Sequence, residues 1–141
     1  NNEINLLDIC VKEDLILSTA NIAPLSHWIT PNIESRRFDT RFFIAYLPEK
    51  QIVQHDGMEL TQSLWINPNK AVDMAFKGEM QMIMPTIKNL QSCSEFTVAK
   101  DMLDSQKRLT NKDIPPILPK FFKENGNWVG LLPGDDGYED H

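Results

Sequence analysis

Cysteine is scarce in this chain of 141 residues, which contains only Cys10 and Cys93. The two thiols lie far apart and lack CxxC spacing, so the sequence predicts free cysteines in a reducing compartment rather than a disulfide framework. Long apolar runs are also missing: no stretch of about 18 apolar residues could span a membrane, and no signal peptide is visible. We therefore expect a soluble, cytoplasmic protein without a membrane partner.

Basic residues are outnumbered, with 14 Lys and Arg against 20 Asp and Glu and a net charge of −6. Binding to nucleic acid depends on clustered cations that displace counterions from phosphates. The acidic balance therefore predicts no nucleic-acid partner. Several acidic residues gather in the C-terminal tail, which we expect to be solvated: Asp135, Asp136, Glu139 and Asp140.

The common catalytic and ligand-binding motifs are missing as well. The three histidines, His27, His55 and His141, have neither an i, i+4 partner nor a cysteine at zinc-ligand spacing, and HExxH is absent. The sequence also lacks GxxxxGK[ST], GxGxxG and GxSxG, the usual phosphate loops and the hydrolase elbow. The residues alone thus predict no self-contained catalytic site.

The overall composition is that of a globular protein, with 41% hydrophobic and 24% charged residues. No repeat or linker divides the chain, so we expect one domain over 1–141, and a compact fold of this length would bury about two-thirds of its unfolded surface. Pro115, Pro116 and Pro119 interrupt regular structure. Residues 106–141 are therefore expected to form an irregular, proline-rich extension with one short strand at 127–132.

Alternating patterns predict the strands. The clearest is 37–47, where aromatic and β-branched residues alternate. Shorter strands are expected at 25–29 and 81–84, and the Asp56-Gly57 turn signal predicts a strand at 58–66 that pairs antiparallel with 37–47. The residues expected in the core are Phe38, Phe42, Ile44 and Tyr46 on one face of 37–47, together with Trp28 and Trp65.

Helical spacing of apolar residues predicts a short helix over 3–13. Asn67-Pro68 is typical of a helix start, and Gly78 is typical of a helix end. A further helical stretch is expected from Pro85. The last predicted helix is capped by Ser92 or Ser94 and buries four residues that share one face: Phe96, Ala99, Met102 and Leu103.

Three charged residues alternate at the start of the strongest predicted strand. Arg37, Asp39 and Arg41 stand at i, i+2 and i+4, so the carboxylate would lie between two guanidiniums in an ion ladder. The alternative is that one arginine remains free to hold a phosphate. The residues themselves leave both interpretations open.

Five separated blocks occur in order between His27 and Leu103: HWITP, RRFDTRFFIAYLP, DGMEL, LWINPNKAV and MPT. With these blocks the chain resembles the C-terminal portion of Nudix hydrolases, closest to the coenzyme A diphosphatase group. The resemblance covers a little over half of the chain. The catalytic signature of that family, the Nudix box REXXEEXG, is not present in this sequence, and we expect it upstream of residue 1 in a longer protein.

The resemblance implies an α+β fold, a partial Nudix-like α/β/α sandwich with a mixed sheet and flanking helices. It implies a full-length enzyme that hydrolyses a nucleoside diphosphate linked to another moiety, of a coenzyme A type, with Mg²⁺ or Mn²⁺ as cofactor. This chain alone would contain no catalytic residue. Arg37 and Arg41 are then candidate contacts to substrate phosphate, and Glu59 is a candidate metal ligand or base, the alternative being a hydrogen-bonded strand glutamate.

Two other interpretations compete with an enzyme fragment. The chain could be a non-catalytic module that keeps a Nudix-like sheet for binding or for forming a homodimer, because exposed strand edges tend to pair with another chain. It could also be an unrelated α+β domain. If the chain is an enzyme fragment, the partner of the full-length protein is a nucleotide-type small molecule. If it is a non-catalytic module, the partner is a ligand or a second copy of the chain.

Overall fold

A computed structural model describes residues 5–141, and its fold is α+β with a mixed three-stranded sheet, as expected. The elements are α1 (Leu6–Lys12), β1 (Ile22–Ile29), β2 (Asp39–Ala45), α2 (Pro68–Phe76), α3 (Met84–Ser94), α4 (Ala99–Gln106), β3 (Pro116–Ile117), β4 (Lys120–Glu124) and β5 (Asn127–Leu131). Short 3-10 helices lie at Thr19–Asn21 and Tyr138–Asp140. In the described part of the chain, none of the helices is long and apolar enough to cross a membrane.

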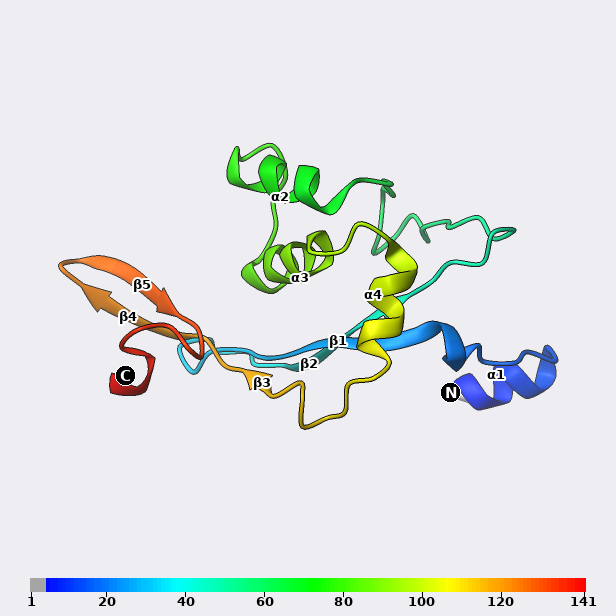
Figure 1. Ribbon diagram of the computed structural model, residues 1–141, viewed down its shortest axis with the longest axis horizontal. Helices are drawn as coiled ribbons and strands as arrows, with labels where there is room; N and C mark the ends of the chain where they lie inside the picture. The colour runs from blue at the N-terminus through cyan, green and yellow to red at the C-terminus, as the bar shows by residue number, and fades with distance from the viewer. Residues whose placement is uncertain (1–4) are drawn as a thin grey trace.

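The sheet is built on a long antiparallel ribbon of β1 and β2. Its strand order is β2-β1-β3, with β3 parallel to β1, while β4 and β5 form a separate hairpin. Figure 1 shows α2 and α3 on one side of the ribbon, the hairpin at one end and α1 at the other. The ribbon therefore connects all the other elements.

Pro24 lies inside β1, although the sequence predicted that the strand starts after it. Proline lacks an N–H and is tolerated only at strand edges and bulges. Both conditions hold here, because the register shifts between Pro24 and Ser26 and β3 pairs only with His27 and Trp28. The strand thus continues through the proline at a point where no third strand needs its N–H.

The two faces of the ribbon differ in what covers them. Trp28 stands opposite Thr40, and its indole N–H donates to Ser26 Oγ at 3.1 Å, while that hydroxyl donates to Asn89 Oδ1 of α3 at 2.6 Å. This face is therefore attached to α3.

Phe42 and Ile44 are half-buried on the predicted core face of β2 whereas Phe43 is exposed, which confirms the alternation within the strand. The prediction of core positions is wrong for Phe38 and Tyr46, which lie just outside the two ends of β2 and are 52% and 47% exposed, and for Trp65, which lies in a segment without a covering layer and is 80% exposed.

The helix signals at α1 and α2 are confirmed. Asn5 and Asp8 form a capping box at the start of α1, so the predicted helix over 3–13 is present in its described part; its first two residues lie outside the described residues. The Asn67 side chain accepts from the N–H groups of the first turn of α2. Gly78, just after this helix, has a φ of 74°, the left-handed conformation that glycine adopts most readily.

The predicted strand over 58–66 is wrong. Residues 46–67 contain no helix or strand, and among residues 5–141 the only strand paired with β2 is β1. The predicted turn does form, since Asp56 Oδ1 accepts from the N–H groups of Met58 and Leu60 at 3.0 Å each. A turn and an alternating pattern were present, but a strand also needs a neighbour.

Four further predictions differ from the structure. Residues 81–83 are extended without a pairing strand, and α3 starts at Met84. Neither Ser92 nor Ser94 caps the next helix, because α3 continues through both and α4 starts at Ala99 with no side-chain cap. Burial on the face of α4 is confirmed for Met102 and Leu103, but it is wrong for Ala99, which is exposed at the first turn, and Phe96 lies before the helix. Besides the expected strand near the C-terminus, residues 106–141 contain β3 and β4, which the sequence did not predict.

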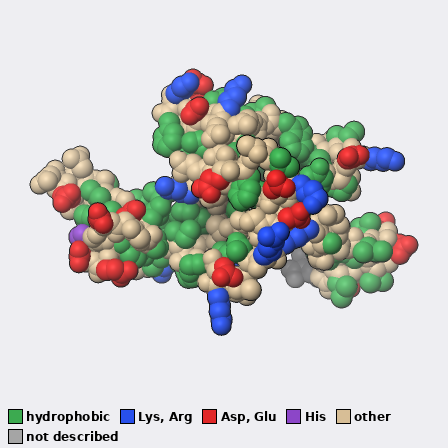
Figure 2. Space-filling model, in the orientation of Figure 1, with side chains coloured by type: hydrophobic (Ala, Val, Ile, Leu, Met, Phe, Trp, Pro, Cys, Tyr) green, Lys and Arg blue, Asp and Glu red, His purple; other side chains and the backbone are tan. Residues whose placement is uncertain are grey.

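The chain exposes much more surface than its mass predicts. Its accessible area is 11,720 Å², against about 7,500 Å² for a compact monomer of this mass. It thus buries about half of its unfolded surface rather than the expected two-thirds. The buried apolar residues are few: Cys10, Ala23, Trp28, Ala71, Val72, Met102 and Leu103. Figure 2 shows apolar side chains on the surface of every lobe of the molecule.

Candidate functional site

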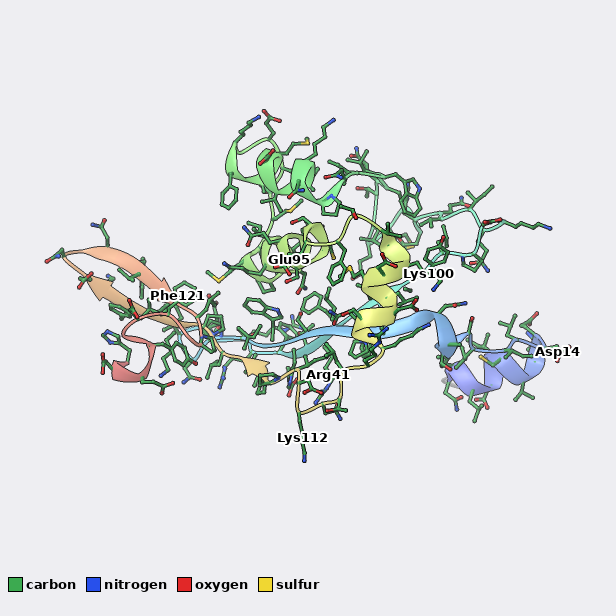
Figure 3. All side chains as sticks on the ribbon, viewed as in Figure 1. Asp14, Arg41, Glu95, Lys100, Lys112 and Phe121 are labelled. Atoms are coloured by element: carbon green, nitrogen blue, oxygen red, sulfur yellow. The ribbon has the colours of Figure 1, made fainter. Side chains whose placement is uncertain are left out.

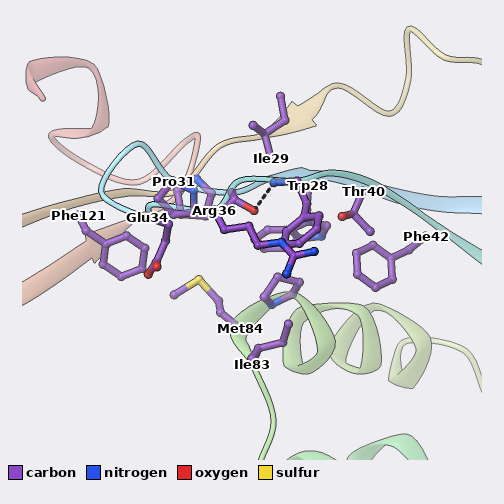
Figure 4. Close-up of a pocket in the computed structure, with 14 residues that line it drawn as sticks. Trp28, Ile29, Pro31, Glu34, Arg36, Thr40, Phe42, Ile83, Met84 and Phe121 are labelled. Carbon is purple, nitrogen blue, oxygen red and sulfur yellow. Dashed lines mark hydrogen bonds between the residues drawn. The ribbon is translucent and has the colours of Figure 1, made fainter. Parts of the chain in front are cut away.

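A cleft of about 470 Å³ lies between the β1–β2 ribbon, the start of α3 and the start of β4 (Figure 4). Its size lies within the range of small-molecule sites, which are mostly apolar with a few polar groups. The apolar side chains that form its walls are Trp28, Phe38, Phe42, Ile83, Met84 and Phe121. This cleft is on the face of the ribbon that carries Trp28 and Thr40.

Two side chains of opposite charge line the cleft. In Figure 4 the Arg36 side chain extends across the cleft near Trp28, whereas the Glu34 carboxylate lies toward Phe121. The Arg36 guanidinium lies 5.0 Å from the centre of the Phe38 ring, within the range of a cation–π contact. Arg36 forms no ion pair within residues 5–141. A positive charge is therefore available to an anionic ligand at an apolar wall.

The connection between β1 and β2 positions Arg36. Thr30 closes this connection, because its N–H donates to the Phe38 carbonyl at 2.9 Å and its hydroxyl accepts from the Phe38 N–H at 3.0 Å. The neighbouring Arg37 donates through Nε to the Thr30 carbonyl at 2.9 Å. One arginine of the pair thus holds the loop, and the other reaches the cleft.

The two predicted phosphate contacts do not line this cleft. Arg37 is engaged with the Thr30 backbone, and Arg41 stands opposite His27, one position away from the Trp28 and Thr40 pair and therefore on the other face of the sheet. In Figure 3 Arg41 lies toward α4, far from Phe121 at the hairpin end. The structure thus places Arg41 on the other face of the sheet from the cleft that Arg36 lines.

The predicted ion ladder around Asp39 is wrong. The Asp39 carboxylate contacts Nε2 of the buried His27 at 2.5 Å and forms no salt bridge with either Arg37 or Arg41. The antiparallel register explains this partner, because His27 and Asp39 are diagonal neighbours on one face. A cross-strand contact therefore replaces the contacts that the spacing along one strand predicted.

Glu59 is exposed and lies within the turn that starts at Asp56 and is closed by Leu60. Hydrogen bonds from the N–H groups of Leu60 and Met58 lower the pKa of the Asp56 carboxyl below its ordinary value. Within residues 5–141, no group of three or more His, Cys, Asp or Glu side chains could hold a metal ion. The structure therefore brings no other ligands to Glu59, and its role stays a prediction.

The sequence did not predict Arg36, Glu34 or Phe121 as parts of one site. The adjacent arginines 36 and 37 were a usable signal for a charged group before the strand. The cleft itself was not predictable, because Phe121 reaches it from the hairpin and Ile83 from the start of α3. No local pattern connects residues so far apart in the sequence.

Comparison with curated proteins relates this chain to Nudix hydrolases. It is 29% identical over 120 residues, 80% of this chain, to acyl-coenzyme A diphosphatase NUDT19 of Xenopus laevis. It is 26% identical over 136 residues, 95% of this chain, to the protein of that name from Homo sapiens. It is also 28% identical over 122 residues, 85% of its length, to putative nudix hydrolase 7 of Caenorhabditis elegans. These similarities support the resemblance found in the sequence.

The chain spans only part of these relatives, namely 31%, 36% and 40% of their lengths in the same order. No family model matches it. No solved structure matches it either. The activity of these whole relatives is therefore only a hypothesis for this chain, and the natural gene product has to be assayed to test it.

Proposed function

We propose that this chain is the C-terminal portion of a Nudix hydrolase whose complete form cleaves a nucleoside diphosphate linked to another moiety, with a coenzyme A type compound as the favoured substrate. The main support is the similarity to curated Nudix proteins over 80–95% of the chain. The mixed sheet with helices is compatible with a partial α/β/α sandwich. The large exposed area is what a portion of a larger fold would have.

The metal ion of such an enzyme would not be held by this chain alone. Hydrolysis of a diphosphate uses Mg²⁺ or Mn²⁺ to neutralise phosphate oxygens and to activate water. The described residues do not fit such an ion, because no group of three or more His, Cys, Asp or Glu side chains among them could hold it. In this proposal the metal-binding glutamates lie in a Nudix box outside the chain, Glu59 adds at most one ligand, and Arg37 and Arg41 contact substrate phosphate.

The test is an assay of the natural gene product with Mg²⁺ or Mn²⁺ on coenzyme A, an acyl-coenzyme A and a dinucleoside diphosphate. We expect cleavage within the diphosphate, read as two phosphate monoesters by mass spectrometry, and no cleavage by the 141-residue chain alone. Loss of cleavage when a chelator removes the metal would support the proposal. A natural product that leaves every substrate intact would contradict it.

A second function, a non-catalytic binding or dimerisation module, is favoured by one observation. Apolar side chains such as Met58, Leu64 and Trp65 are exposed in the irregular segment, and a partner could cover them. Size-exclusion chromatography with light scattering separates this function from the first. A dimer of the natural product without hydrolase activity would favour the module, whereas a strict monomer that binds no nucleotide would exclude it.

A further inference from the structure

We propose that the cleft between the β1–β2 ribbon and α3 binds an acyl chain that carries a carboxylate, with the chain against the apolar wall and the carboxylate on Arg36. The inference goes beyond the hydrolase, because it concerns binding at a site that needs neither the metal nor the Nudix box. It assigns the cleft a ligand class, an amphipathic anion of medium chain length.

The walls of the cleft favour an acyl chain over a nucleobase. A nucleobase is recognised through hydrogen bonds to its polar edge, whereas an alkyl chain needs only apolar surface. Thr30 lines the cleft, but its hydroxyl already accepts from the Phe38 N–H. The flexible Met84 adapts to chains of different shape. Besides the charged Glu34 and Arg36, the lining side chains therefore offer the edge of a base the hydroxyls of Thr30 and Thr40 alone.

The charges of the cleft favour an anion and give it a direction. Arg36 has no carboxylate partner within the described residues, and guanidinium groups bind carboxylates through paired hydrogen bonds. Glu34 lines the same cleft on the Phe121 side and repels a negative group there. The carboxylate is thus directed to the Arg36 side and the chain to the aromatic walls.

The experiment is isothermal titration calorimetry of decanoate and decanol into the natural gene product without added metal. We expect decanoate to bind at least about tenfold more tightly than decanol, because a hydrogen-bonded charge is lost in the alcohol. Arg36→Gln should remove this difference, and Glu34→Gln should tighten decanoate binding. Arg108→Gln, an exposed arginine outside the cleft, is the matched control and should leave binding unchanged.

A second variant separates binding from folding. Ile83 lines the cleft, is 68% exposed and occupies the N-cap position of α3 without a side-chain hydrogen bond. Aspartate is a favoured N-cap residue, so Ile83→Asp should keep or strengthen the helix while its charge repels the carboxylate. We expect an unchanged or higher melting temperature together with loss of decanoate binding.

Decanoyl-coenzyme A distinguishes the source of the chain. The acyl chain of decanoyl-coenzyme A ends in a neutral thioester, so tighter binding of decanoyl-coenzyme A than of decanoate, still lost in Ile83→Asp, would show that the chain enters the cleft without a carboxylate and would overturn the role given to Arg36. Tighter binding of decanoate would support a site for free fatty acids. The inference is overturned if decanoate does not bind, if decanol binds equally well, or if Arg36→Gln and Arg108→Gln bind alike. Absence of hydrolase activity affects none of these binding results.

Discussion

The β1–β2 ribbon and the segment 46–67 contain similar residues but differ in structure. Both carry alternating apolar residues, yet the ribbon is paired and attached to α3 through Ser26 and Asn89, while the segment 46–67 has no regular structure. Trp28 of the ribbon is 4% exposed and Trp65 of the segment is 80% exposed. Alternation therefore creates a strand only where a neighbour supplies hydrogen bonds and a covering layer.

The largest expected difference between the two regions concerns their tryptophans. Trp28→Ala should lower the free energy of unfolding by about 3–5 kcal/mol, because it removes a buried aromatic side chain and leaves a cavity. Trp65→Ala should change it by no more than about 0.5 kcal/mol, as exposed substitutions usually do. Urea denaturation followed by far-UV circular dichroism measures both values. Equal losses in the two variants would contradict the comparison.

The polar contact between the ribbon and α3 should have the next largest effect. Asn89 is buried, and its side-chain oxygen accepts a hydrogen bond from the Ser26 hydroxyl. Asn89→Ala leaves that hydroxyl without its acceptor and should lower the free energy of unfolding by about 1–3 kcal/mol. Gln54→Ala, an exposed amide in the segment 46–67, is the control. The same denaturation experiment checks this prediction. An unchanged free energy of unfolding in Asn89→Ala would show that this contact does not hold α3.

Removal of the helix cap at the end of the segment 46–67 should have a moderate effect. Asn67 ends the irregular segment and accepts from the N–H groups of Asn69 and Lys70. Asn67→Ala should reduce stability by about 1 kcal/mol, whereas Asn67→Asp should retain the cap. Thermal denaturation of the two variants tests this, and an identical melting temperature for both would mean that the cap contributes nothing.

The smallest expected effect is a local dependence on pH at the Asp56 turn. The pKa of Asp56 is lowered in the folded turn, so the carboxylate stabilises the turn above the ordinary value of 3.8, and this stabilisation is lost as pH falls through the lowered pKa. Amide chemical shifts of Met58 and Leu60 should therefore change only in acid. Asp56→Asn should remove this transition. Shifts that move near neutral pH would contradict the assignment.

Local signals predicted the local features of this fold. The Asn67-Pro68 start and the Gly78 end of α2, the Asp56-Gly57 turn and the alternation of Phe42 and Phe43 all depend on neighbouring residues, and all are present. Features that depend on distant partners were missed or wrong. The strand over 58–66 lacks a partner, and β4 was hidden because Pro119 precedes it and charged residues stand at its ends.

The candidate site was predictable only in part for the same reason. The sequence directed attention to the arginines before β2, but it selected Arg37 and Arg41, and only the fold shows that Arg36 reaches the cleft. The partner of Asp39 also depended on strand register, since His27 lies on another strand. Residue type was informative, whereas side-chain direction required the tertiary structure.

We propose above that this chain acts as part of a longer Nudix hydrolase. The most direct test is the mass of the natural gene product by intact mass spectrometry, combined with sequencing of the residues that precede Asn1. We expect a longer protein with an upstream REXXEEXG segment. A natural protein that starts at or near Asn1, or a longer one without this segment, would contradict the claim and favour a binding or dimerisation module.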